Sequence, residues 1–495
     1  MNLNYCGADL RVPFSLLRSL LPELDILAGT RWQDSPLTRA VFHRPGRDGE
    51  SLSERQSPDD QLRYYTDKRV LRGLRHIAFD YATKIDKDVV LKLASFPTDP
   101  DSRFIEWLGS EGRLKVEISF QPKKDELTRD RHSEEFHNIV AGIKSGTLPP
   151  NELSAYLSLL LSYGDSWTAK LVADAYLGSV DDVDVALTDV LGIPYALQGD
   201  TGMAKLLWER WLTASPIDEA RARYSLSMLQ ARHNPRALLD LESAEKNLTL
   251  AWKRLQEEPP TPQTEYESVF NRNGMALLLF RKKNFAEARA VLETGIATIQ
   301  ASGYAEKLHH TVLTSNLARV VKSMGDLQEA ERLFREAIAM DPEFAEYHQD
   351  FASFLSDMGR FEEAAVEAGR TVELDPSMPE AHRLLGFILM QLGAPRRARD
   401  EYAKAANLGD DEAVLDMLRA SYEAETPEWT VQARFRAAQA QLDAKSKAEV
   451  ELLLMQARTA LDPSIDVQVA LNDLQARFPN DELITEAVHL NSNTE

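Results

Sequence analysis

A repeat of 34 residues is the feature that most restricts what this chain can fold into. Thr311–Phe344, Ala345–Met378 and Pro379–Glu412 follow one another without a gap and carry similar residue types at matching positions. A unit of this length holds two helices and cannot bury its apolar face alone, so neighbouring units stack and the array grows in one dimension. The pattern therefore predicts a helical array with an extended groove that holds another molecule.

The repeated positions have the chemistry of a helical hairpin. Small residues at positions 8 and 20 let the two helices approach closely, and a large residue at position 24, such as Phe334 or Tyr402, fills the gap to the next unit. Proline at position 32 ends the second helix in two units, whereas the third has Asp410 there. Position 15 is where the first helix ends in a left-handed conformation that glycine adopts at little cost, and it is occupied by Gly325, Gly359 and Gly393.

This pattern resembles the tetratricopeptide repeat, a family of two-helix units, and the resemblance implies a right-handed superhelix. A further unit starts at Val269, 42 residues before Thr311, and has Lys283 in place of the glycine at position 15. Another starts at Val185, and a weaker one at Pro150. We therefore expect a tetratricopeptide-like array over residues 150–425, followed by capping helices and a short tail over 426–495.

Residues 1–145 lack the repeat and have a different pattern of apolar and polar residues. A short helix is expected at Asp101–Leu108, and His43–Gln61, which has almost no apolar residues, is expected to be a mobile loop. The most plausible junction with the array is Gly142–Asn151. Strands are predicted where apolar and polar residues alternate, at Arg75–Ala82, Val89–Phe96 and Leu114–Phe120. The expected fold is thus mainly α, with a small α+β domain of no recognised family in front of the array.

Composition restricts the classes of partner and the location. The chain has a formal net charge of −21, which argues against non-specific nucleic-acid binding and against docking to anionic lipid. Thr311–Glu425 alone holds 12 Lys and Arg against 23 Asp and Glu, as expected for solvated outer faces. Met1–Pro22 does not have the pattern of a secretory signal, and no apolar stretch approaches the ~20 residues of a membrane span. We expect a soluble, cytoplasmic protein.

The sequence offers little support for an enzyme, and no cofactor or metal is expected. His132 and His137 are five residues apart, whereas zinc-binding helices use a four-residue step. The single cysteine, Cys6, has no histidine close in sequence. Carboxylates on adjacent strands of the N-terminal region, Asp80 or Asp88 with Glu117, could hold magnesium in a nuclease-like site. His348 and His382 share position 4 of successive repeats, which indicates a structural ladder.

The resemblance also implies which residues face a partner, because this family lines its concave groove with positions 2, 5, 9, 12 and 13 of each first helix. Apolar anchors with Arg and Gln suit a peptide-binding face, and the cations could grip a carboxylate or an acidic peptide. The asparagine that some relatives use for a C-terminal carboxylate is missing at position 9, which carries Arg319 and Ser353. The candidate groove residues are Asn273, Phe280, Arg281, Arg319, Lys322, Gln349, Ser353, Arg383, Phe387 and Gln391.

Three functional hypotheses follow. The leading one is a non-enzymatic adaptor or regulatory subunit whose array binds a protein or peptide. In the second, the N-terminal domain is an enzyme or effector, and the array is its sensor or targeting arm. In the third, the array pairs with copies of itself to form a homo-oligomer. An alternative for the groove itself is that the protein's own N-terminal domain or C-terminal helices fill it.

Overall fold

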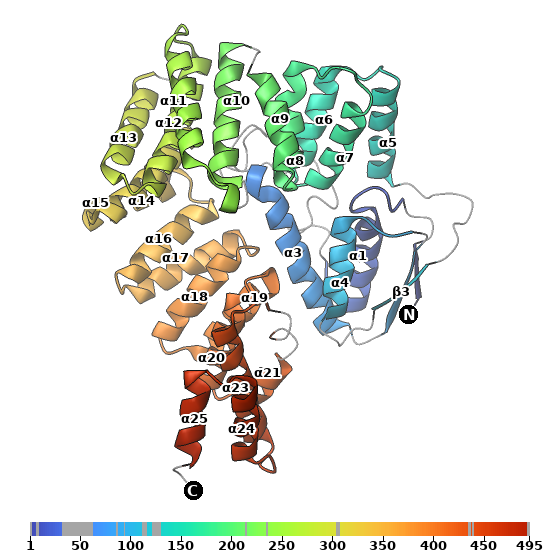
Figure 1. The fold of residues 1–495 in the computed structure, drawn as a ribbon, viewed down its shortest axis with the longest axis vertical. Helices are drawn as coiled ribbons and strands as arrows, with labels where there is room; N and C mark the ends of the chain where they lie inside the picture. The colour runs from blue at the N-terminus through green and yellow to red at the C-terminus, as the bar shows by residue number, and fades with distance from the viewer. Residues whose placement is uncertain are drawn as a thin grey trace.

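The computed structural model describes residues 2–5, 9–31, 63–85, 88–93, 95–110, 116–120, 130–212, 215–233, 236–302, 307–433, 437 and 440–492. Helices dominate it and follow one another around an arc, with the N-terminal elements inside the arc (Figure 1). The predicted mainly α fold with a helical array is confirmed. Among the described residues, no helix is long and apolar enough to cross a membrane.

The N-terminal elements, called the head below, are β1 (Asn2–Tyr5), α1 (Ser15–Ala28), α3 (Arg63–Lys84), β2 (Val89–Leu93), α4 (Asp99–Ser110) and β3 (Val116–Phe120). The array helices up to the irregular segment are α5 (Arg131–Lys144), α6 (Pro150–Ser162), α7 (Ser166–Leu177), α8 (Thr188–Leu197), α9 (Thr201–Trp211), α10 (Pro216–Met228) and α11 (Leu241–Gln256). A π-helical turn, Leu229–His233, and a 3-10 turn, Arg236–Leu238, lie between α10 and α11.

The later helices are α12 (Pro262–Arg281), α13 (Phe285–Ser302), α14 (Lys307–Met324), α15 (Leu327–Met340), α16 (Ala345–Asp357), α17 (Phe361–Leu374), α18 (Pro379–Gln391), α19 (Pro395–Leu408) and α20 (Glu412–Glu423). The C-terminal helices are α21 (Pro427–Gln432), α23 (Ala444–Leu461), α24 (Val467–Arg477) and α25 (Glu482–Ser492). The expected domain limits at residues 145, 150 and 425 stay predictions. Helix α5 contributes Phe136 and Ile143 to the same apolar cluster as α6–α9.

The head contains a three-stranded parallel sheet in the order β1-β2-β3, with Leu3 opposite Leu91 and Leu91 opposite Ile118. The strands predicted around β2 and β3 are confirmed, and so is the helix at α4. The predicted strand Arg75–Ala82 is wrong, because that segment belongs to helix α3. The buried residues of α3 include Val70, Leu74, Ile77, Ala78 and Tyr81, which recur at helical spacing. The remaining strand is β1, and the expected loop at 43–61 lies outside the described residues.

The glycines at position 15 adopt the conformation that the repeat predicts. Gly325, Gly359 and Gly393 have φ of 88°, 71° and 68°, where a side chain is strained. The chain reverses there, and α14–α15, α16–α17 and α18–α19 pack as antiparallel hairpins. Lys283 takes the same left-handed conformation, with φ of 60°. The hairpin geometry is thus kept in the unit that lacks the glycine.

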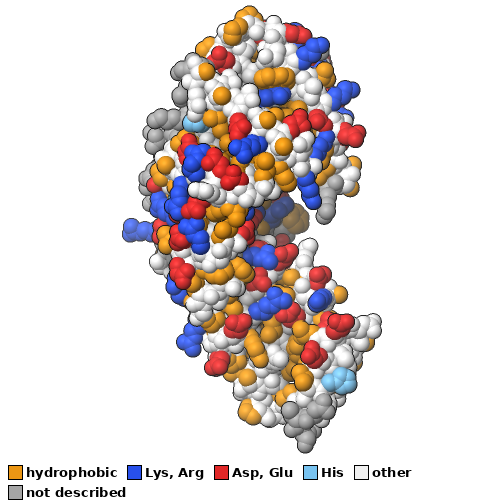
Figure 2. Space-filling model, turned by 90° about the vertical axis from the view of Figure 1, so that its left-hand side faces the viewer, with side chains coloured by type: hydrophobic (Ala, Val, Ile, Leu, Met, Phe, Trp, Pro, Cys, Tyr) orange, Lys and Arg blue, Asp and Glu red, His pale blue; other side chains and the backbone are white. Residues whose placement is uncertain are grey.

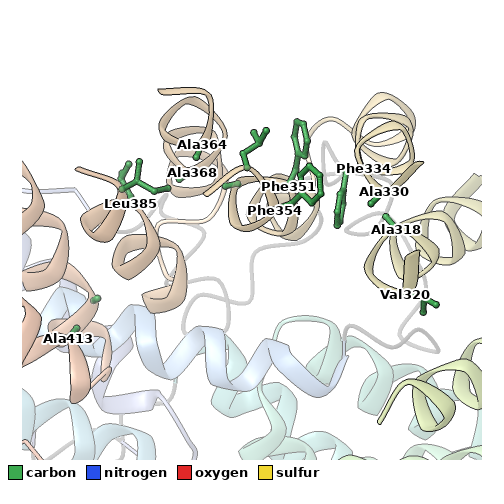
Figure 3. Packing of buried hydrophobic residues seen from close by; sticks show 14 of the residues in the cluster. Ala318, Val320, Ala330, Phe334, Phe351, Phe354, Ala364, Ala368, Leu385 and Ala413 are labelled. Atoms are coloured by element: carbon green, nitrogen blue, oxygen red, sulfur yellow. The ribbon is translucent and has the colours of Figure 1, made fainter. Parts of the chain in front are cut away.

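Apolar side chains from neighbouring hairpins share one continuous core in the middle of the array. The ring of Phe334 of α15 packs against the rings of both Phe351 and Phe354 of α16, with centroids 6.1 and 5.5 Å away (Figure 3). The small Ala318 and Ala330 let α14 and α15 approach closely beside it. The large residue at position 24 therefore joins one unit to the next, as expected.

The histidines at position 4 are buried structural residues. Nδ1 of His348 lies 2.7 Å from Oε2 of Glu367 on α17, and Nε2 lies 2.9 Å from the carbonyl oxygen of Pro342. His382 makes the same two contacts one repeat later, at 2.6 and 3.1 Å. Each histidine therefore ties the first helix of its unit to the second helix and to the preceding turn.

The head is not separated from the array by a solvent-filled gap. Tyr163 and Trp167, from the turn after α6 and the start of α7, belong to the same apolar cluster as α1, α3 and α4. The rings of Phe14 and Trp167 meet edge to face with centroids 5.6 Å apart. The two regions therefore share interior residues.

Candidate functional site: the inner side of the arc

The candidate groove residues lie on first helices of the repeats: α12, α14, α16 and α18. Figure 3 shows α14 and α16 on the side of the array that faces α3, with α15 and α17 behind them. Arg281, Arg319, Phe387 and Gln391 are exposed, and Phe280, Lys322, Gln349, Ser353 and Arg383 are half-buried. Asn273 is 5 % exposed, and its side-chain oxygen accepts a hydrogen bond of 2.7 Å from Asn316, so it lies between helices. The others can be reached from solvent, and their role in partner binding stays a prediction.

The cations predicted to grip a carboxylate or an acidic peptide are accompanied by carboxylates of the next repeat. Lys322 Nζ lies 2.5 Å from Asp357 Oδ2, and Arg319 Nε lies 3.9 Å from Asp350 Oδ2. Arg281 donates a hydrogen bond to the carbonyl oxygen of Ala231. These cations of the candidate groove therefore already have partners within the array, in ion pairs or a hydrogen bond. They do not form a common site for an anion.

Arg383 is held most firmly of these cations. Its Nη1 lies 2.6 Å from Glu412 Oε2, its Nε lies 3.0 Å from Asp416 Oδ2, and Asp410 lies at 3.6 Å. Burial alone would lower the pKa of Arg383, but these carboxylates outweigh it and the pKa is raised. The surrounding charge is negative, which does not suit the acidic peptide considered from the sequence.

The exposed apolar residue of this face is Phe387. Its side chain is 44 % exposed, and its ring meets Phe361 edge to face with centroids 6.5 Å apart. A large aromatic that is supported on one side and open on the other is the kind of residue that anchors protein–protein contacts. Gln391 lies one helical turn further along α18 and is also exposed.

Helix α3 of the head lies on the inner side of the arc (Figure 1). It contacts the array at the turn before α18, at the beginning of α18 and at α19. Arg69 Nε lies 3.1 Å from Asp375 Oδ2, and Arg72 Nη2 lies 3.1 Å from Glu380 Oε1. The head therefore covers the turn before α18. The alternative that the protein's own N-terminal domain or C-terminal helices fill the groove stays a prediction. Helical periodicity in residues 63–84 was the signal that could have shown α3, and no local signal places it here.

Of the two carboxylate pairs considered for the nuclease-like alternative, the pair with Asp80 does not lie on adjacent strands, whereas the pair of Asp88 with Glu117 stays a prediction. Asp80 lies on helix α3, not on a strand, and pairs with Lys84 at 2.7 Å. The side chain of Glu117 and the whole of Cys6 lie outside the described residues. Within the described ranges, no group of three or more His, Cys, Asp and Glu residues is placed to hold a metal ion.

Models of the tetratricopeptide repeat family match residues 267–343 and 323–370. The chain contains tetratricopeptide repeats. The two matches overlap and together run from α12 to α17. The N-terminal region has no family match, and no curated protein matches the chain.

Solved structures with a similar arrangement of helices include the PilF protein of Pseudomonas aeruginosa, with 19% identity, a TM-score of 0.34, and coverage of 45% of this chain and 97% of that structure. The C-terminal part of a tetratricopeptide repeat protein from Cytophaga hutchinsonii has 14% identity and a TM-score of 0.39, covering 50% and 97%. One from Parabacteroides merdae has 13% identity and a TM-score of 0.34, covering 56% and 99%. With TM-scores this low, these structures do not indicate what this chain binds.

Proposed function

We propose that this protein is an adaptor that binds a segment of another protein on the first helices of its tetratricopeptide repeats. Protein interaction is the role that such repeats support, and the observation that carries the proposal here is Phe387. It combines a predicted partner-facing position with a large, accessible ring. The side of the array that faces the viewer in Figure 2 carries charged side chains of both signs, interspersed with hydrophobic ones.

The finer parts of the proposal rest on composition. The negative net charge of −21 supports a protein partner over nucleic acid. A regulatory role and a cytoplasmic location belong to the same proposal.

Capture of a partner from native lysate tests the proposal, with tagged wild-type protein as bait. Phe387→Ala should weaken capture by about 30-fold, because truncating an aromatic anchor typically costs ~2 kcal/mol or more. Val366→Ala is the matched control, since Val366 is also an exposed apolar residue, at 70 %, but lies on the second helix α17. Equal capture by wild type and Phe387→Ala would contradict binding at this face.

A further inference from the structure

Helix α3 has two faces of different chemistry. Val70, Leu74 and Ile77 are buried in the core of the head. Arg69 and Arg72 are three residues apart on another side of the helix and point to the array, where both form ion pairs. The helix is therefore amphipathic, and its basic side is the one that meets the repeats.

The basic side follows a line of contacts on the array. Arg69 pairs with Asp375 in the turn before α18, and Arg72 pairs with Glu380 at the beginning of α18. Arg75, a further three residues along, lies against the turn after α19, because a methyl group added at Gly409 would be 2.6 Å from its Nη1. Three arginines at i, i+3 and i+6 thus meet two successive inter-repeat turns, which a single helix can reach at once.

The array surface under these arginines is acidic, and Asp375, Glu380 and Asp411 are called the acidic strip below. The Asp375 side chain is only 9 % exposed and also accepts hydrogen bonds of 3.0 and 2.6 Å from the backbone N–H and hydroxyl of Ser377, so its carboxylate is fixed in place. The charge of Asp411 acts on Arg75. The strip is a preformed set of carboxylates that is complementary to one face of a basic helix.

Part of the contact between α3 and the strip reaches solvent. In the Arg72–Glu380 pair the two side chains are 37 % and 56 % exposed, and ion pairs that reach solvent are weak and screened by salt. The apolar side of α3 packs in the core of the head, which Tyr163 and Trp167 of the array also join. At the strip itself the contacts are the ion pairs of Arg69 and Arg72 and the contact of Arg75 with the turn at Gly409, and these are what a competing helix replaces.

We propose that the acidic strip is a docking site for a basic amphipathic helix of a partner protein, and that α3 occupies it until such a helix displaces it. The inference rests on the proposed function and names the partner class: a helix with arginines at i, i+3 and i+6. Carboxylates arranged in this way repel nucleic acid and anionic lipid, so a protein helix is the occupant that the charge favours.

A labelled synthetic peptide with the sequence of residues 63–84 is the probe, and its binding to the full chain is followed by fluorescence anisotropy at low salt. The Arg69→Glu/Arg72→Glu chain should bind this peptide about tenfold more tightly than wild type, because the internal competitor is removed; this corresponds to ~1.4 kcal/mol. A peptide with Gln at the positions of Arg69, Arg72 and Arg75 should lose that binding. Equal affinity of wild type and the double variant, or of the two peptides, would overturn the inference.

A charge-swapped chain guards against an effect of misfolding. Adding Asp375→Lys/Glu380→Lys to the double variant restores internal pairing with the signs reversed, and this chain should again bind the peptide weakly. Tight binding by the charge-swapped chain would place the peptide elsewhere and refute the strip as the site. Partner capture that depends on Phe387, together with a probe that fails to bind, would refute this inference and leave the proposed function standing.

Discussion

Lys283 should be replaceable by glycine with a gain in stability, because the chain departs from its own repeat there. Other units have glycine at this position, whereas Lys283 is held at φ of 60°. A left-handed conformation costs a residue with a side chain about 1–2 kcal/mol. Glycine also makes the unfolded chain more flexible, which lowers the stability of the folded protein by about 0.4–1 kcal/mol. The expected net gain of Lys283→Gly is therefore about 0.5–1 kcal/mol.

The rest of the turn should survive the substitution. The backbone N–H of Lys283 donates to the Phe280 carbonyl at 2.9 Å, and that of Asn284 donates to the Leu279 carbonyl at 2.8 Å. Neither bond uses the lysine side chain. The effect should thus come from the backbone conformation alone.

Urea unfolding followed by circular dichroism measures the effect, read as a higher midpoint at an unchanged slope. Lys283→Ala is the matched control, since it removes the amine but keeps Cβ, and it should stay within about 0.5 kcal/mol of wild type. The reciprocal change Gly359→Ala should lose stability through its backbone only, because a methyl group there would meet nothing within 4 Å. The reasoning is refuted if Lys283→Gly is no more stable than Lys283→Ala.

Three other outcomes test the array. Burial alone would lower the pKa of His348, but its hydrogen bonds to a carboxylate and a carbonyl outweigh burial and raise the pKa above the ordinary 6.5. The stability that His348 contributes is then complete below its unperturbed pKa of about 6.5 and is lost as the pH rises through the raised pKa. The difference in unfolding free energy between wild type and His348→Ala should therefore shrink between about pH 5.5 and about pH 8.5, on either side of that pKa. A constant difference would contradict this. Gly386→Ala should destabilise by about 1–3 kcal/mol in the same urea assay, because its new methyl group would lie 2.8 Å from the Tyr402 ring, whereas Gly369→Ala, in open space within α17, should be neutral or stabilising. Phe334→Ala should cost about 3–5 kcal/mol through the cavity it leaves between two units, and a loss below about 1 kcal/mol would show that the units do not depend on it.

The array could be predicted because its signals are local and repeated. Glycine at position 15 fixes the end of each first helix, and three units in register identify the hairpins. Lys283 shows the limit of this argument, since the hairpin forms without the glycine and tertiary packing decides the conformation.

The head could be predicted only in part. In Arg75–Ala82 the apolar residues alternate, but the wider spacing of Val70, Leu74 and Tyr81 is helical, so a short window favoured the wrong period. Strand β1 has only four residues, too few to show alternation.

The arrangement of the candidate site could not be predicted, because it depends on contacts between residues that are far apart in the sequence. The sequence identified Arg383 as a partner-facing cation, but its carboxylate partners lie beyond the second helix of the unit, up to 33 residues further along the chain. The position of α3 inside the arc comes from packing between distant segments. Electrostatic matching of this kind becomes visible only when the units are stacked.

The sharing of Tyr163 and Trp167 between head and array limits how this protein can be divided or recombined. A cut between residues 145 and 150 would leave Phe14 without the ring that covers it and would expose a tryptophan on the other fragment. Neither fragment would keep a closed interior. Duplication of repeats away from the head would leave this shared core intact. Exchange of the head for another domain would require new residues on both sides of the contact between head and array.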